Sequence, residues 1–253
     1  MAVLKVLVLG GTTEASALAR LLAATPGFDA VLSYAGRTRN PLVQPIATRV
    51  GGFGGVGGLA DYLCTQGVQA LVDATHPFAA QMSHHAVAAA EIAGVPLLAL
   101  RRGPWVAGAD DDWLGVADMA AAAEAIGIAR RRVFLTVGQK EVAAFRARPQ
   151  HVYLIRSVDP IDVDALPPDA VLINARGPFE AAAERLLLED HGIDVIVTKN
   201  SGGSATAGKL AAARELGLPV IMVERPAVPL VATVETEAAA LDWLRGHAMR
   251  LGA

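Results

Sequence analysis

A chain of 253 residues, 53% of them hydrophobic, is long enough for one large α/β domain or two small ones with a sizeable core. Its 22 basic and 25 acidic residues give a net charge of −3, which offers no argument for a nucleic-acid partner or an anionic membrane surface. The single cysteine, Cys64, excludes an internal disulfide framework and a cysteine-rich metal site, and it fits a cytoplasmic location.

The first apolar run, residues 3–10, is short and ends in a glycine turn, so we expect a strand there and not a signal peptide. No apolar stretch has the length of a membrane span. Continuous apolar strands with intervening helices are typical of a parallel sheet covered on both faces. Such strands are predicted at 30–36, 69–75 and 96–102, with a further short strand within 47–55, and helices are predicted at 13–25, 57–67 and 78–94.

Residues 103–131 interrupt this rhythm with the sequences GPW, ADDDW and RRR, and we expect them to connect two domains. The predicted fold is therefore α/β, with two Rossmann-like halves over residues 1–102 and 132–253, each with a parallel sheet, and a cleft between them. Exchange of a terminal strand between the halves stays open. In the second half, strands are predicted at 132–138, 152–158, 170–177, 194–200 and 219–225, and helices near 140–147, 178–190, 205–216 and 235–249.

The first predicted strand runs into the turn GGTTEA. A Rossmann fold places the pyrophosphate of a dinucleotide at such a turn, on the N-terminus of the following helix. The letters differ from the G-x-G-x-x-G fingerprint, and an ordinary tight turn is the alternative. By position, we expect cofactor contacts from Gly10, Gly11, Thr12, Thr13 and Glu14.

The end of the second strand, SYAGRTR, indicates which dinucleotide binds. An NAD site carries Asp or Glu there for the ribose 2′-hydroxyl, whereas an Arg accommodates the 2′-phosphate of NADP. Here the carboxylate is absent, so we expect NADPH, bound by Gly36, Arg37 and Thr38. The same absence argues against S-adenosylmethionine. Arg39 fits either the phosphate site or a solvated loop.

Two further glycine-rich stretches resemble phosphate loops. Residues 51–58 hold six glycines, but they follow a weak strand, and we expect a flexible turn near the edge of the cofactor. In SGGSATAGKL, Gly203, Gly208 and Lys209 have P-loop spacing, but Leu210 stands where the magnesium-binding Ser or Thr belongs. ATP hydrolysis is therefore not expected, and Lys209 is interpreted as an ordinary residue of the first helical turn.

Signatures of several enzyme classes are absent. None of Tyr34, Tyr62 and Tyr153 is followed four residues later by Lys, which excludes the Tyr-x-x-x-Lys pair of short-chain dehydrogenases. There is no G-x-S-x-G elbow and no histidine cluster with metal spacing. His84 and His85 are adjacent on a predicted helix and point in different directions, so no metal site is expected.

The sequence DATHPF, residues 73–78, ends a central strand of the first half, at the sheet edge where open α/β folds bind ligands. We expect Thr75 to contact the cofactor. His76 is expected first of all to shape the pocket with Pro77 and Phe78; it is also the one candidate catalytic side chain, as a proton donor.

Several of these motifs occur together and in a fixed order. The chain carries GGTTEA, AGR, GGFGG, DATHPFA, RRGPW, TKNSGG and a later RP. From about residue 4 to residue 226 it thereby resembles the precorrin-6A reductase family of the cobalamin pathway. The resemblance implies reduction of a double bond of the precorrin-6A macrocycle by NADPH, with hydride added to C19 and a proton to C18, giving precorrin-6B. Hand-over of this product to the next pathway enzyme is conceivable.

A tetrapyrrole with many carboxylates requires separated cations and an apolar surface, and Arg pairs with carboxylates through a bidentate fork. For any one Arg, including Arg102, a surface ion pair is an equally good interpretation. A Gly-Gly turn at a helix start can also bind an anion through its backbone N–H groups. The expected substrate contacts are Arg101, Trp105, Lys140, Arg156, Arg176, Lys199, Ser201 and Gly202.

Three questions stay open at the level of sequence. The substrate could be the cobalt-containing macrocycle of the anaerobic pathway. The chain could be a non-catalytic dinucleotide-sensing module, although the set of cations and the DATHPF segment argue against it. The proton could come from water, from a substrate carboxyl group or from His76.

Overall fold

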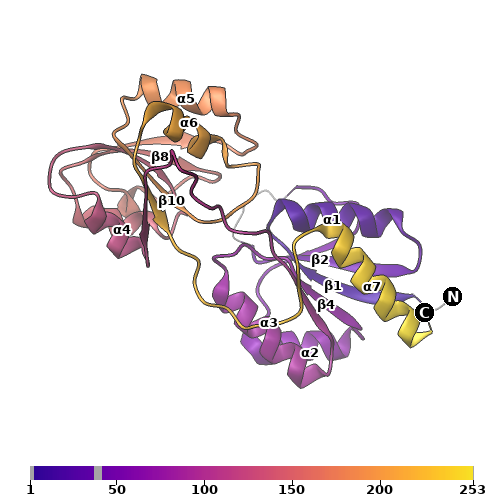
Figure 1. The fold of residues 1–253 in the computed structure, drawn as a ribbon. Helices are drawn as coiled ribbons and strands as arrows, with labels where there is room; N and C mark the ends of the chain where they lie inside the picture. Colours follow the sequence, from indigo (N-terminus) through magenta and orange to yellow (C-terminus); the bar gives the residue numbers. More distant parts are fainter. Residues whose placement is uncertain (1–2, 37–41, 253) are drawn as a thin grey trace. The chain divides into compact units, whose positions relative to one another are not determined.

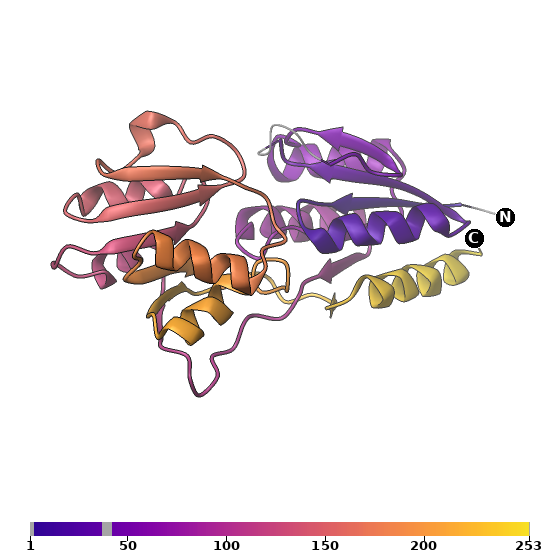
Figure 2. The ribbon, with the colours of Figure 1, turned by 90° about the horizontal axis from the view of Figure 1, so that it is seen from above.

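The computed structural model describes residues 3–36 and 42–252. The chain forms two compact units, Met1–Arg102 with Pro226–Ala253 (unit 1) and Gly103–Arg225 (unit 2). Each unit contains one six-stranded sheet in which all strands are parallel, with helices on both faces (Figures 1 and 2). The predicted α/β class with two parallel-sheet halves is confirmed. Among the described residues, no helix is long and apolar enough to cross a membrane.

The sheet of unit 1 has the strand order β12-β5-β4-β1-β2-β3, which is the order of a dinucleotide-binding Rossmann fold. Its helices lie in two layers, α1 with α7 on one face and α2 with α3 on the other (Figure 1). The strands are β1 Leu4–Leu9, β2 Phe28–Tyr34, β3 Ala47–Val50, β4 Ala70–Asp73, β5 Leu97–Leu100 and β12 Thr233–Val234. The helices are α1 Thr13–Ala24, α2 Gly55–Thr65, α3 Ala80–Ala93 and α7 Glu237–Leu251.

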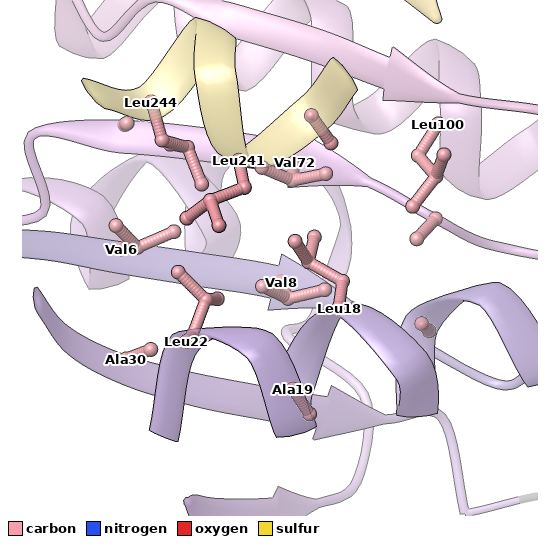
Figure 3. Packing of buried hydrophobic residues seen from close by; sticks show 14 of the residues in the cluster. Val6, Val8, Leu18, Ala19, Leu22, Ala30, Val72, Leu100, Leu241 and Leu244 are labelled. Carbon is pink, nitrogen blue, oxygen red and sulfur yellow. The ribbon is translucent and has the colours of Figure 1, made fainter. Parts of the chain in front are cut away.

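The apolar side chains of β1 pack on both faces of this sheet, because successive side chains of a strand point to opposite sides. Val6 and Val8 pack with Leu18 of α1 and Leu241 of α7 (Figure 3). Leu7 belongs to the opposite core, which α2 and α3 cover. Burial of each such side chain contributes about 1.5–3 kcal/mol to folding. The two cores fix the end of β1, and therefore the glycine turn that follows it.

The sheet of unit 2 has the order β6-β11-β10-β7-β8-β9. Helices α5 and α6 cover one face and α4 lies on the other (Figure 1). The helix expected near 140–147 is a 3₁₀ helix. The strands are β6 Trp113–Val116, β7 Arg132–Thr136, β8 Val152–Ser157, β9 Ala170–Asn174, β10 Val195–Lys199 and β11 Val220–Val223. The helices are α4 Met119–Ala125, α5 Ala181–Asp190, α6 Gly208–Leu216 and the 3₁₀ segments η1 Val142–Ala147 and η2 Val163–Ala165.

The structure corrects the expected domain bounds beyond residue 102. The supposed connecting segment 103–131 contains β6 and α4, and β6 pairs with β11 as an edge strand of unit 2. The C-terminal segment 226–253 leaves unit 2, because β12 pairs with β5 and α7 packs on α1. The sheet of unit 1 therefore receives its outermost strand, β12, from the C-terminal segment that follows unit 2 in the chain, which answers the open question of strand exchange. The cleft between the halves stays a prediction.

Candidate functional site

The turn after β1 consists of two glycines, Gly10 and Gly11, each with a distinct structural reason to be glycine. A Cβ on Gly10 would lie 2.6 Å from Cδ1 of Leu32, so the turn sits directly on β2. Gly11 has φ +125°, a conformation that side chains disfavour. Helix α1 begins at once, with Thr12 as its N-cap: the Thr12 hydroxyl accepts a hydrogen bond from the Ala15 N–H at 3.1 Å. Backbone N–H groups at such a helix start bind phosphate.

The Thr12 hydroxyl also joins two loops. It donates to the carbonyl oxygen of Ala74, just beyond β4, at 2.9 Å. Strands β1 and β4 are neighbours in the sheet and their connections leave in opposite directions, so this is the point at which open α/β sheets bind ligands. The predicted cofactor turn and the DATHPF segment are thereby held together at one end of one sheet.

Glu14 is paired within unit 1. Its Oε2 atom accepts from Nη1 of Arg102 at 2.7 Å and from the hydroxyl of Thr13 at 3.1 Å. Burial raises the pKa of this carboxyl, but the hydrogen bonds and the charge of Arg102 outweigh burial and hold the pKa below its usual range. Glu14 is therefore a carboxylate that holds Arg102 next to the first turn of α1, and its expected contact with the cofactor stays a prediction.

Asp73, at the end of β4, organises the DATHPF segment. Its Oδ1 atom accepts from the Thr75 N–H at 3.1 Å and from the Thr75 hydroxyl at 2.6 Å. Its Oδ2 atom accepts from Ser83 Oγ of α3 at 2.6 Å and from Nη2 of Arg101 at 3.2 Å. Ser83 was not anticipated from sequence. The carboxylate thus orients both Thr75 and Arg101, a predicted cofactor contact and a predicted substrate contact.

His76 is half-buried directly after Thr75. Its Nδ1 atom accepts a hydrogen bond from the backbone N–H of Phe78 at 3.2 Å. With Nδ1 acting as acceptor, the neutral imidazole carries its proton on Nε2. The ring centroids of His76 and Phe78 are 5.9 Å apart. This arrangement fixes the tautomer that a proton donor requires, and the catalytic role stays a prediction.

The 2′-phosphate part of the expected cofactor site is described only in part. Gly36 follows β2 with φ +76°, whereas Arg37, Thr38 and Arg39 lie outside the described residues.

Arg49 of β3 is a residue that sequence reasoning missed. Its guanidinium donates to Ser33 Oγ at 2.8 Å and to the carbonyl oxygens of Gly51 and Gly52 at 3.0 and 3.2 Å. It also lies 3.9 Å from the centroid of the Phe53 ring. The glycine-rich stretch expected to be a flexible turn is therefore tied to β2 by one side chain. The pairing of β2 with β3 explains this contact, because their register places Arg49 opposite Ser33.

In unit 2 the RRGPW and TKNSGG motifs meet. The backbone N–H of Trp105 donates to Oδ1 of Asn200 at 2.8 Å, and Nδ2 of Asn200 donates to the Trp105 carbonyl at 3.1 Å. The indole Nε1 donates to the carbonyl of Gly203 at 3.0 Å. A Cβ on Gly202, which has φ +67°, would lie 2.1 Å from the carbonyl oxygen of Gly103, so only glycine fits there.

The RP motif at 225–226 joins the same cluster. Nε of Arg225 donates to the carbonyl of Asn200 at 2.8 Å. Its Nη2 donates to the carbonyls of Gly103 and Ser201 at 2.9 and 3.1 Å. Arg225 therefore fastens the first residue of unit 2 to the turn after β10, a structural role that the sequence motif did not reveal.

The basic side chains of unit 2 that were predicted to bind the substrate differ in their burial and in their partners. Nζ of Lys199 lies 3.0 Å from Oε1 of Glu141, and this ion pair joins the loops after β10 and β7. Lys140 and Arg176 are exposed. The expectation for Arg156 is corrected: its guanidinium is buried under Phe179 and forms a bidentate pair with Glu184. The cause is packing of α5 on β8, which places Glu184 opposite Arg156.

Lys209 is also placed differently from the expectation. It is only 3% exposed, and its Nζ donates to the carbonyl of Thr206 at 2.7 Å and lies 4.8 Å from the centroid of the Trp105 ring. It is therefore part of the interior and not an ordinary first-turn residue. Among the residues that the structure describes, no group of three or more His, Cys, Asp or Glu side chains could hold a metal ion.

Comparison with known proteins shows what the chain is similar to. The sequence model of the family described as precorrin-6x reductase CbiJ/CobK matches residues 5–245. A precorrin-6A reductase of Rhodobacter capsulatus is 52% identical over 243 residues, 96% of either chain. A solved structure described as CobK precorrin-6A reductase matches with a TM-score of 0.92 and 53% identity, over 96% of this chain and 97% of the other. A cobalt-precorrin-6A reductase of Salmonella typhimurium is 31% identical over 242 residues, 89% of either chain.

Proposed function

The chain belongs to the precorrin-6x reductase family, and on that premise we propose how its residues serve the reduction of precorrin-6A. The reaction belongs to cobalamin biosynthesis and reduces a carbon–carbon double bond of the macrocycle, so the protein is an oxidoreductase that acts on a CH–CH group. The precorrin-6A reductase of Rhodobacter capsulatus is 52% identical to this chain, whereas the cobalt-precorrin-6A reductase of Salmonella typhimurium is 31% identical. This difference favours the metal-free macrocycle as substrate.

The cofactor proposed is NADPH, which supplies the hydride when bound. The observation that carries its placement is the hydrogen bond between Thr12 and Ala74, which brings the glycine turn and the DATHPF segment to one point of the sheet. Gly10 and Gly11 leave the backbone open for the pyrophosphate, and the N-terminus of α1 stabilises its charge. Arg102, held by Glu14, adds a guanidinium group near the turn, with its charge balanced by that carboxylate.

Selectivity for NADPH is assigned to the segment after β2. Gly36 leads out of the strand, and Arg37 and Thr38 follow where an NAD site carries a carboxylate. A guanidinium binds a phosphate through charge-assisted, often bidentate, hydrogen bonds. Thr75, oriented by Asp73, contributes a buried wall on the other side of the glycine turn.

Each unit, taken by itself, carries candidate cations for substrate carboxylates. In unit 1, Arg101 is oriented by Asp73. Unit 2 contributes Lys140, Arg176 and Lys199, and the turn of Ser201 and Gly202. The half-buried ring of Trp105 supplies an apolar surface for the macrocycle.

The hydride is assigned to C19 and the proton to C18. His76 is the proposed proton donor, because its Nδ1 is engaged by Phe78 and its Nε2 carries the proton. Water and a carboxyl group of the substrate are the alternatives. His76→Gln separates them: a fall in kcat with unchanged KM for both substrates supports His76, and an unchanged kcat rejects it.

The test of the function is a spectrophotometric assay of NADPH oxidation with precorrin-6A. Parallel reactions contain NADH in place of NADPH, or the cobalt-loaded macrocycle in place of the metal-free one. Oxidation with the metal-free substrate is expected. If NADPH binds but neither macrocycle is reduced, the chain is a dinucleotide-sensing module and the reductase function is rejected. If NADPH is oxidised with the cobalt-loaded macrocycle alone, the protein is instead a reductase of the anaerobic pathway.

A further inference from the structure

The buried ammonium group of Lys209 lies close to the Trp105 ring. Lys209 follows the first residue of α6, and its Nζ sits 4.8 Å from the ring centroid of Trp105. Transfer of an ammonium group into a protein interior is unfavourable unless other groups compensate. Here one carbonyl, that of Thr206, accepts its hydrogen bond at 2.7 Å, and the face of the indole supplies cation–π attraction. The indole is therefore a principal partner of this cation.

Trp105 is held at three further points by the loop after β10. Asn200 pairs with both its backbone N–H and its carbonyl, and Gly203 accepts from the indole N–H. Asn200 is itself buried, and its backbone N–H donates to Val223 of β11 at 2.9 Å. Rotation of the ring would break the indole hydrogen bond and the cation–π contact together. The orientation of Trp105 is thus set before any ligand binds.

We propose that Lys209 and Asn200 are positioning residues that hold Trp105 as a rigid apolar wall for the tetrapyrrole macrocycle. This inference rests on the proposed function. An aromatic side chain that is already ordered loses little conformational entropy when a flat ligand packs on it. Removal of either support therefore weakens binding of the macrocycle and leaves binding of NADPH unchanged, because both supports belong to unit 2.

The environment of Lys209 also makes this support sensitive to pH. The charged groups that act on it are Arg156 of β8 and Glu184 of α5. Burial, reinforced by Arg156 and opposed by Glu184, lowers the pKa of Lys209 to about 7. The ammonium form, which alone makes the cation–π contact, is therefore lost as the pH rises through neutrality. Affinity for the macrocycle should fall over the same range.

The first experiment measures steady-state kinetics with precorrin-6A and NADPH. Lys209→Met should raise KM for the macrocycle roughly 3- to 30-fold and leave KM for NADPH unchanged. Lys209→Arg keeps a permanent cation and should restore most of the affinity while removing the dependence on pH. Asn200→Ala should also act on the macrocycle alone. The matched control is Lys5→Met on β1 of unit 1, which should change neither constant.

The second experiment follows the fluorescence of Trp105 and needs no substrate. In a Trp113→Phe, Trp243→Phe protein, Trp105 is the remaining tryptophan. Its emission should change with pH with a midpoint near 7, and the change should vanish when Lys209→Met is added. Quenching of the same emission by precorrin-6A gives its Kd without turnover.

The outcomes separate the two proposals. If the Trp105 emission does not change with pH, or if its change with pH persists in Lys209→Met, the proposed support of the ring is overturned. An unchanged Kd for the macrocycle in Lys209→Met overturns its role in substrate binding even if the titration behaves as expected. Failure of the unmodified protein to oxidise NADPH, with tight binding of precorrin-6A retained, rejects only the reductase function.

Discussion

The hydroxyl of Thr12 connects the two motifs of the proposed cofactor site, because it caps α1 through Ala15 and also donates to the carbonyl of Ala74 at 2.9 Å. One oxygen atom therefore both stabilises the start of the helix and fixes its distance from the end of β4. A Ser in its place would keep both hydrogen bonds, whereas Ala would remove both.

Thr12→Ala should lower the free energy of unfolding by about 1.5–3 kcal/mol, since it removes a helix cap and a second hydrogen bond. Urea denaturation measures this loss. Thr236→Ala is the matched control: among the described residues, the Thr236 hydroxyl bonds to the Ala239 N–H of α7 alone, so about 1 kcal/mol is expected. Equal losses in the two variants would show that the bond to Ala74 contributes nothing.

Asp73→Asn should be among the more damaging single substitutions in unit 1. The amide cannot accept at both positions, so it would leave Arg101 and Ser83 without a matched partner in a buried site. A loss of about 2–4 kcal/mol in unfolding free energy is expected, together with weaker binding of NADPH. Asp29→Asn, on the exposed side of β2, is the control and should change stability by less than about 0.5 kcal/mol.

Gly10→Ala tests the close contact between Leu32 and the turn proposed to bind the pyrophosphate. The new Cβ would lie 2.6 Å from Leu32 Cδ1, so Leu32 must move, at a cost of about 1–3 kcal/mol, and affinity for NADPH should fall. For Gly57→Ala we expect the opposite effect on stability. A Cβ there meets nothing within 4 Å in helix α2, so it should stabilise the protein by about 0.5–1 kcal/mol. A Gly10→Ala protein with unaltered stability and cofactor affinity would contradict the proposed packing.

The pair of Glu14 and Arg102 predicts a specific dependence of stability on pH. Because the pKa of Glu14 is lowered in the folded state from 4.5, its ionised form stabilises folding above about pH 4.5, and this contribution disappears as the pH falls through the folded pKa. The stability difference between the unmodified protein and Glu14→Gln should therefore be about 1 kcal/mol near pH 7 and vanish in acid. A constant difference at every pH would contradict it. Glu189→Gln, in an exposed pair with Arg185, should have little effect at either pH.

Arg37→Ala tests the choice of cofactor. It should raise KM for NADPH roughly tenfold or more and leave KM for NADH unchanged, since only NADPH carries the 2′-phosphate. Arg130→Ala, which breaks an exposed pair with Asp169 in unit 2, is the control for loss of an arginine. Preference for NADPH that survives Arg37→Ala would reject the assignment.

The sequence alone determined the fold class, most strands and the family. Apolar runs of four to eight residues bounded by Gly and Pro indicate buried strands. The residues of GGTTEA, DATHPFA and TKNSGG indicate the turns that follow such strands, and their combination indicates the family. Strands β6 and β12 were not predicted, because they are edge strands of only four and two residues, too short for an apolar run to stand out from the surrounding loops. Their sheets could not be inferred either, since the periodicity of a strand does not indicate its neighbours.

Only the tertiary structure decided which side chains are buried and which pair. Arg156 and Lys209 have the same sequence signature as surface cations, yet packing of α5 and α6 on the second sheet encloses both and gives them Glu184 and Trp105 as partners. In the same way, β12 and α7 complete the first sheet although they follow the last strand of the second. These are contacts between residues far apart in sequence. Their free energy depends on the shape of both partners, which no local pattern of residues contains.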